Sequence, residues 1–178
     1  KKNIIKQENG KIIKSVGVDS QKFCIDNYSE EKLKKLKKEN FLDGKIVVLM
    51  VARAIWDKGI KEYYDAAKIL KRDYENVEFL LVGPTDNGNL SCASEEFLTS
   101  GYVKWLGHRD DIVDLTAISD IYVLPSYREG LPATLMEAAS MSKPIVTTDT
   151  VGCRDVVVDG ENGFLVPIKN TEQLIKKI

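Results

Sequence analysis

Two carboxylates stand eight residues apart at Glu129 and Glu137, on either side of Pro132. Pro132 suits the first turn of a helix, where a missing N–H costs nothing. The preceding apolar run Ile121–Leu124 fits a buried strand. A strand therefore leads through a loop to a helix N-terminus, which can hold a phosphate. The carboxylates are better suited to accept hydrogen bonds from hydroxyls, so the stretch predicts a ligand with both groups, such as a sugar nucleotide.

Either glutamate taken alone has a simpler explanation, as an acid near a helix N-terminus or as a solvated side chain. The whole stretch does not, because its parts follow in the order that a ligand site at the end of a parallel strand requires. Thr134 and Glu137, three residues apart, share a helix face. We therefore expect both carboxylates to face a cavity beyond the strand end.

Two cations, Arg53 and Lys58, follow the strongly apolar run Ile46–Val51. Such cations at the carboxyl end of a strand can neutralise a diphosphate, since Arg can grip two oxygens and Lys supplies a point charge. Alone they mean little, but with the helix N-terminus they would form an anion site without a metal. The sequence has no D-x-D motif, so we expect neither a catalytic metal nor another cofactor.

Apolar runs and amphipathic stretches alternate along the chain. The pattern predicts an α/β fold, a doubly wound parallel sheet with helices on both faces. Residues 1–10 are expected to be a linker remnant, and 11–178 a nucleotide-sugar-binding domain. The expected strands are 11–16, 46–51, 77–82, 103–106, 121–124, 144–147 and 164–166. The expected helices are 29–40, 57–74, 93–99, 110–118, 133–141, 154–158 and one capped by Thr171.

The composition is that of a globular domain, with 178 residues of which 43% are hydrophobic and 30% charged. The net charge of −1, from 26 basic and 27 acidic residues, argues against a nucleic-acid partner. Cys24, Cys92 and Cys153 are scattered, as reduced thiols are, and fit neither a disulfide framework nor a zinc site.

The stretch Glu129-Gly-Leu-Pro-Ala-Thr-Leu-Met-Glu137 resembles the E-x7-E motif of the retaining glycosyltransferases of sequence family 4, which have the two-Rossmann-domain GT-B fold. Ala52–Gly59 resembles the family's G-R-x4-K-G diphosphate grip, with Ala52 in place of the usual glycine. Tyr102–Asp111 resembles the segment that holds the nucleotide base through backbone groups. Asp149–Cys153 departs from the family, because only its Gly152 matches a common glycine pair. The likeness runs from about Ile12 to the end of the chain.

The resemblance implies the second, donor-binding domain of a hexosyltransferase that uses a UDP-sugar. Arg53 and Lys58 would hold the diphosphate, Glu137 the ribose hydroxyls, and Glu129 would be the catalytic residue facing the transferred sugar. The other residues that it implies as nucleotide-binding are Gly107, His108, Arg109, Gly130, Leu131, Ala133 and Thr134.

The resemblance also implies a partner for the donor, a glycan or polyprenyl-diphosphate-linked acceptor held by an N-terminal domain. The isolated chain would then be inactive, and its parent would be cytoplasmic and peripheral to the inner membrane. Three stretches resemble bacterial enzymes that extend lipid-linked glycans with N-acetylhexosamine, namely Val51–Gly59, Ser91–Ser94 and Leu124–Gly130.

Two alternatives stay open from the sequence. A sugar-nucleotide epimerase or dehydrogenase would need the G-x-G-x-x-G fingerprint, which Gly83–Gly88 does not supply. It would also need a Tyr-x-x-x-Lys pair, and Lys58–Lys61 offers no such tyrosine. The second alternative is a non-catalytic nucleotide-binding or oligomerisation module.

Overall fold

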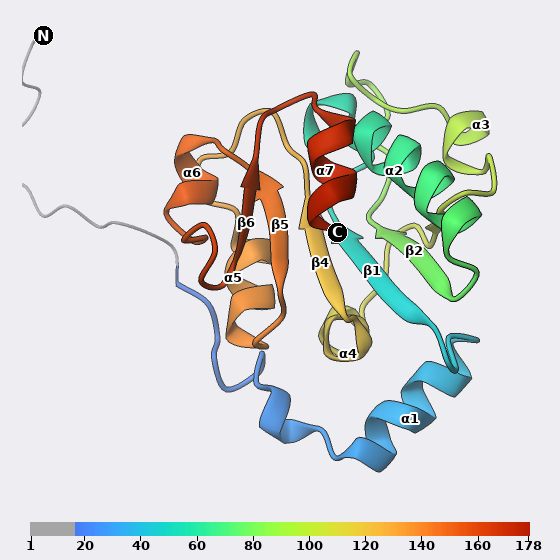
Figure 1. Cartoon of the computed structure of the whole chain (residues 1–178), viewed down its shortest axis with the longest axis vertical. Helices are drawn as coiled ribbons and strands as arrows, with labels where there is room; N and C mark the ends of the chain where they lie inside the picture. Colours follow the sequence, from blue (N-terminus) through green and yellow to red (C-terminus); the bar gives the residue numbers. More distant parts are fainter. Residues whose placement is uncertain (1–16) are drawn as a thin grey trace, which may run out of the picture.

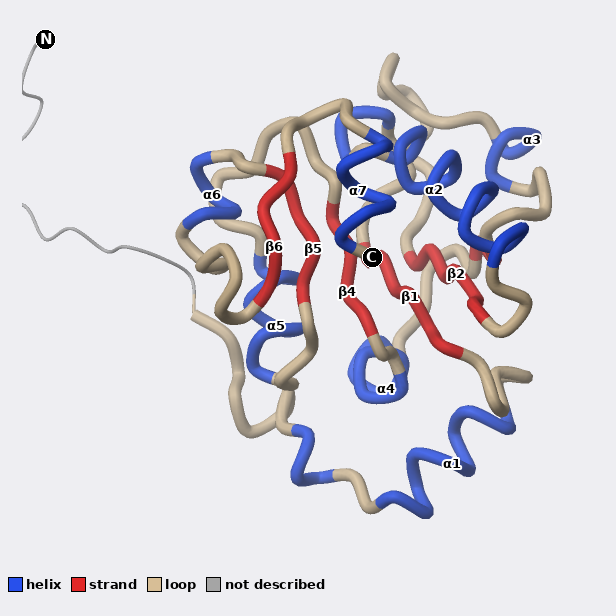
Figure 2. Tube along the Cα trace, in the orientation of Figure 1, coloured by secondary structure: helices blue, strands red, loops and turns tan. Residues whose placement is uncertain are grey.

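Parallel strands form one sheet in the computed structural model, which describes residues 17–178 (Figures 1 and 2). The six strands of this part of the chain lie in the order β3-β2-β1-β4-β5-β6. The expected strand at 11–16 falls outside the described residues. The strands are β1 (Ile46–Val51), β2 (Val77–Val82), β3 (Lys104–Trp105), β4 (Ile121–Leu124), β5 (Ile145–Thr148) and β6 (Gly163–Val166).

The central strands are buried because helices cover both faces of the sheet. All of β2 and every residue of β1 after Ile46 are buried. The Tyr63 hydroxyl, on the helix α2 (Ile60–Asp73), donates to the carbonyls of Val48 and Leu80, at 2.8 and 3.0 Å. These bonds connect the helix to both central strands. This core holds the ends of the central strands in fixed relative positions.

Helices begin at polar caps where the sequence supplies them. Ser29 accepts from the amide of Lys32, and Ser94 from the amide of Phe97. Among the described residues, no helix is both long and apolar enough to cross a membrane. The helices are α1 (Glu30–Glu39), α2 (Ile60–Asp73), α3 (Glu95–Leu98), α4 (Ile112–Ile118), α5 (Ala133–Ser140), α6 (Val151–Arg154) and α7 (Thr171–Lys177), with short 3-10 turns η2 (Ile25–Asn27) and η3 (Trp56–Lys58).

The winding direction reverses between β1 and β4, which are neighbours although two strands separate them along the chain. With right-handed crossovers, α2 and α3 cross one face and α4, α5 and α6 the other. The last helix, α7, returns to the first face and packs on α2 (Figure 1). The expected doubly wound fold is confirmed, and its switch point lies at the carboxyl ends of β1 and β4.

Three local predictions need correction. The helix expected at 154–158 is instead α6, which ends at Arg154, because the three β-branched residues Val156–Val158 disfavour helix. The cap of α7 is Asn170, whose side chain accepts from the amide of Gln173 at 2.9 Å, and Thr171 is the first helical residue. The helix expected at 57–74 is divided into η3 and α2 by Gly59, at φ 75°.

Candidate active site

A groove lies at the switch point, where the loops after β1 and β4 face each other. One cavity, of about 260 Å³, lies between these loops and the start of α5. A second, of about 220 Å³, continues toward the ends of β2 and β3. Both share Val51, Ala52, Arg53 and Thr134, so they form one continuous groove. Of the predicted residues, the first cavity also brings together Lys58, Glu129, Leu131 and Ala133, and the second His108 and Arg109.

Each predicted diphosphate cation forms an ion pair with a carboxylate of the chain. A guanidinium nitrogen of Arg53 lies 2.6 Å from Asp86 Oδ2, and Lys58 Nζ lies 2.7 Å from Glu129 Oε1. The Lys58 and Glu129 side chains are only 21% and 10% exposed. An incoming anion would compete with both carboxylates for these cations.

Asp86 was missed in the sequence analysis. It lies in the loop after β2, the strand beside β1, and the carboxyl ends of parallel neighbours share one edge of the sheet. Its position just after β2 could have identified it from the sequence as a residue near Arg53. Asp86 also accepts from the side-chain amide of Asn89 at 3.0 Å, which holds its carboxylate in place.

The start of α5 supplies backbone donors to the groove. Pro132 precedes the helix in an extended conformation, and its carbonyl accepts the amides of Leu135 and Met136. The amides before these, at Ala133 and Thr134, have no partner within the helix. Both residues line the first cavity, opposite Arg53 and Lys58.

Of the two carboxylates expected to face the cavity, only Glu129 lines it; Glu137 and two predicted glycines lie outside both linings. Glu137 is half-buried on α5, where burial raises the pKa of its carboxyl and the charge of Lys22 opposes the shift. Gly107 and Gly130 line neither cavity. A Cβ at Gly152 would lie 2.2 Å from the Gly130 carbonyl oxygen, so α6 packs closely against the loop that carries Glu129.

The His108 and Arg109 side chains of the second cavity each lie beside a neighbouring carboxylate. Arg109 donates twice to Asp111, at 2.7 and 2.5 Å, and this pair raises the pKa of Arg109 and lowers that of Asp111. The His108 side chain is 72% exposed, 3.3 Å from Asp110. The Gly83 amide donates to the Gly107 carbonyl at 2.8 Å, which joins the second cavity's two loops.

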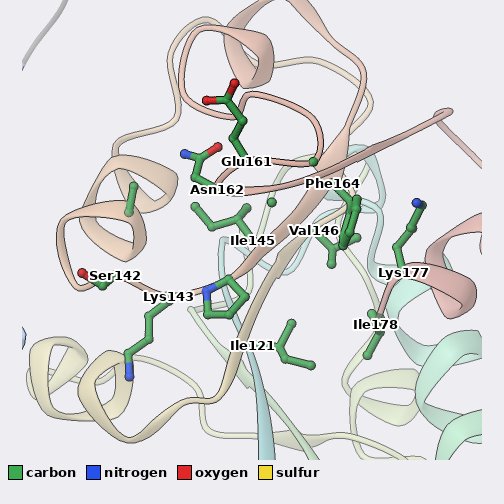
Figure 3. Close-up of a pocket in the computed structure, with 14 residues that line it drawn as sticks. Ile121, Ser142, Lys143, Ile145, Val146, Glu161, Asn162, Phe164, Lys177 and Ile178 are labelled. Atoms are coloured by element: carbon green, nitrogen blue, oxygen red, sulfur yellow. The ribbon is translucent and has the colours of Figure 1, made fainter.

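A larger cavity of about 690 Å³ lies at the opposite, amino end of β4, β5 and β6 (Figure 3). Its wall is largely apolar, with Ile121, Ile145 and Phe164. The Lys143 amine donates hydrogen bonds to the carbonyls of Ala117 and Ser119, at 2.6 and 2.8 Å. The cavity's other lysine, Lys177, lies with its amine 4.0 Å from the centre of the Phe164 ring. The two amines are engaged separately, so they do not form a cation pair at one position.

The Tyr-x-x-x-Lys spacing does occur, at Tyr28 and Lys32 and at Tyr64 and Lys68, which the sequence analysis overlooked. The Lys32 amine lies 4.0 Å from the centre of the Tyr28 ring, and neither residue lines the groove. The Tyr64 hydroxyl is buried and donates to the Leu98 carbonyl at 2.8 Å. The Lys68 amine lies 5.5 Å from the centre of the Tyr102 ring. Neither side chain lines the groove, so the pair serves packing.

Comparison with known proteins decides between the alternatives. Residues 11–178 match the family described as glycosyl transferases group 1. The chain belongs to this family. The resemblance found in the sequence is thus confirmed, and a group 1 glycosyltransferase replaces the epimerase or dehydrogenase as the class of protein.

Individual group 1 relatives extend over almost the whole chain. It is 44% identical over 167 residues to the N,N'-diacetylbacillosaminyl-diphospho-undecaprenol alpha-1,3-N-acetylgalactosaminyltransferase of Campylobacter jejuni, covering 94% of this chain and 43% of that protein. It is 34% identical over 167 residues to the capsular polysaccharide biosynthesis glycosyltransferase CapM of Staphylococcus aureus, covering 92% and 43%.

A solved structure shows the same architecture. The crystal structure of Anabaena Alr3699/HepE in complex with UDP has a TM-score of 0.79 and 27% identity, with 90% of this chain and 44% of that chain covered. The same protein has also been solved with UDP-glucose, at a TM-score of 0.78. The group 1 chain therefore spans less than half the length of these relatives.

Proposed function

We propose that the chain is the donor-binding domain of a retaining glycosyltransferase and binds a UDP-sugar in the groove. One observation carries the proposal: Arg53, Lys58 and the amino end of α5 line a single cavity at the switch point. Two cations and free amides form a site for a diphosphate without any metal. UDP complexes of the Anabaena neighbour support the choice of nucleotide.

Each part of the donor has a place along the groove. The diphosphate lies between Arg53 and Lys58 and the Ala133 and Thr134 amides, and the base lies toward Gly107–Arg109. Glu137 lies outside both cavity linings, one turn after Thr134 on α5, and the family resemblance assigns it the ribose hydroxyls. Glu129, at the Lys58 end, faces the transferred sugar. Its negative charge would favour the positive charge that develops at the anomeric carbon as the phosphate leaves.

The group 1 relatives suggest the donor and the acceptor. The Campylobacter relative is an N-acetylgalactosaminyltransferase acting on an undecaprenol-linked substrate. By this likeness, the donor is a UDP-N-acetylhexosamine and the acceptor a polyprenyl-diphosphate-linked glycan. The acceptor is held by a further domain of a longer protein, which works at the cytoplasmic face of the membrane. The 178 residues alone then bind donor without transferring sugar.

Thermal unfolding with added nucleotides tests the proposal. A ligand that binds the native state raises the melting temperature with its concentration. UDP and UDP-N-acetylglucosamine should raise it, whereas NAD should not. Stabilisation by NAD alone would contradict the proposal. Sugar transfer by the 178-residue chain to a lipid-linked acceptor would overturn the assignment of the acceptor to another domain.

A further inference from the structure

Tyr127 connects the loop that carries Glu129 to three other parts of the chain. Its hydroxyl donates to the two carboxylate oxygens of Glu62, at 2.9 and 2.8 Å. Its amide donates to the Asp57 carbonyl at 2.8 Å. The amine of Lys169, in the loop before α7, lies 4.8 Å from the centre of its ring. Tyr127 does not line the groove, yet it stands two residues before Glu129.

Glu62 is an unusual partner because it is a buried carboxylate on α2, only 7% exposed. Its carboxylate has no other hydrogen bond and no ion pair within residues 17–178. Burying a charge without such a partner is costly. The Tyr127 hydroxyl is therefore the hydrogen-bond donor that stabilises the buried Glu62 carboxylate. This bond fixes the position of the Tyr127 side chain relative to α2.

The backbone around this pair brings the two loops into direct contact. The buried Ser126 hydroxyl lies 3.2 Å from the Asp57 carbonyl oxygen. A Cβ at Gly59 would lie 2.1 Å from the Pro125 carbonyl oxygen, so only glycine allows this approach. Lys58 lies between Asp57 and Gly59, in the segment that these contacts fix.

We propose that Tyr127 and Glu62 are positioning residues that fix the Glu129 carboxylate relative to Lys58. The chain of contacts runs from Glu62 on α2, through Tyr127, to Glu129 two residues later. Neither member of the pair lines the groove. The inference rests on the proposed function. It expects the pair to affect how the transferred sugar is bound at Glu129, and not how UDP is bound.

Calorimetric titration of Tyr127→Phe with UDP and with UDP-N-acetylglucosamine tests the inference. UDP affinity should stay within about twofold of the wild type, because Arg53 and the amino end of α5 are untouched. The Tyr127 amide and the Ser126 hydroxyl still bond the Asp57 carbonyl, so Lys58 also stays in place. The ratio of the two dissociation constants should shift at least about fivefold against the sugar nucleotide. Glu62→Ala should reproduce this shift, whereas Glu62→Gln keeps an oxygen acceptor for Tyr127 and should preserve the ratio.

Tyr64→Phe is the matched control, because it also removes a buried hydroxyl but one that donates to the Leu98 carbonyl. It should lower the melting temperature and leave the ratio unchanged. If Tyr127→Phe does not fold, the double variant Glu62→Leu/Tyr127→Phe removes the unpaired charge and should show the same shift.

The outcomes distinguish a failure of UDP-sugar binding from a failure of the positioning role. If the wild type binds neither UDP nor the sugar nucleotide, the proposed function fails and the inference fails with it. If the wild type binds both, and folded Tyr127→Phe or the double variant keeps the wild-type ratio, only the positioning role is overturned. A shift of equal size in Tyr64→Phe would also overturn it, because that would show a general loss of rigidity.

Discussion

The amine of Lys58 lies 2.7 Å from a carboxylate oxygen of Glu129, although 71 residues separate them along the chain. One follows β1 and the other follows β4, so their meeting is a direct product of the strand order. The pair marks the boundary between the proposed diphosphate and sugar positions. When a UDP-sugar binds here, the Lys58 amine must interact with both the Glu129 carboxylate and the phosphate of the ligand.

Arg53→Ala and Lys58→Ala should each weaken UDP binding about tenfold or more, and the double variant most. Charge-assisted hydrogen bonds contribute about 1.5–3 kcal/mol. Uridine, which has no phosphate, should lose little in calorimetry of the same variants. Lys61→Ala, which removes an exposed cation paired with Asp65, is the control. Equal losses for uridine and UDP would show that the two residues act on folding instead.

Asp86→Asn should strengthen UDP binding, because it releases Arg53 from a carboxylate 2.6 Å away. The Arg53 side chain is 57% exposed, and such ion pairs contribute about 0.2–1 kcal/mol, so the gain should be about 1.4- to fivefold. Titration at low salt measures it, with Asp65→Asn as the control. A loss of affinity would mean that Asp86 shapes the site rather than competing with the ligand.

Glu129→Gln should leave UDP affinity no lower than in the wild type, since it frees Lys58 for the phosphate. In a longer enzyme that includes an acceptor domain, the same change should lower turnover more than donor binding, because the charge at the anomeric carbon develops chiefly in the transition state. Glu137→Gln measured beside it should weaken UDP. Equal weakening of UDP by both changes would show that the two roles are wrongly divided.

Glu137→Gln should also change how stability depends on pH. Burial raises the pKa of Glu137 above its ordinary value of 4.5, so its charged form destabilises the fold. The variant should therefore melt higher than the wild type at pH 7. The difference should shrink as pH falls through the raised pKa and vanish below 4.5, where both states bind the proton. Glu31→Gln, exposed on α1, is the control, and a difference that persists at low pH would contradict the burial argument.

Gly152→Ala should destabilise the fold by about 1–3 kcal/mol, because its Cβ would meet the Gly130 carbonyl oxygen at 2.2 Å. Chemical denaturation measures the change. Gly17→Ala, where the added Cβ meets nothing within 4 Å, is the control. An unchanged free energy of unfolding in Gly152→Ala would show that α6 and the loop carrying Gly130 are not in tight contact.

The sequence predicts the frame of the groove because buried parallel strands leave a local signature. The apolar runs of β1 and β4 place Arg53, Lys58 and Glu129 at one edge, and the structure brings all three to one cavity. Helix ends were predicted less well, since the α6 region has competing Gly and Val preferences. Pairings such as Tyr127 with Glu62 leave no local pattern at all, because they depend on how separate loops approach in space.

The central claim, that the groove between β1 and β4 binds the UDP moiety, is tested most directly by an amide NMR titration of the chain with UDP. The account predicts saturable shifts in the amides of Arg53, Gly107–Arg109, Ala133 and Thr134. Residues around the cavity at the other end of the sheet, such as Lys143 and Phe164, should stay unchanged. Saturable shifts confined to that second region, or none at millimolar UDP, would contradict the account.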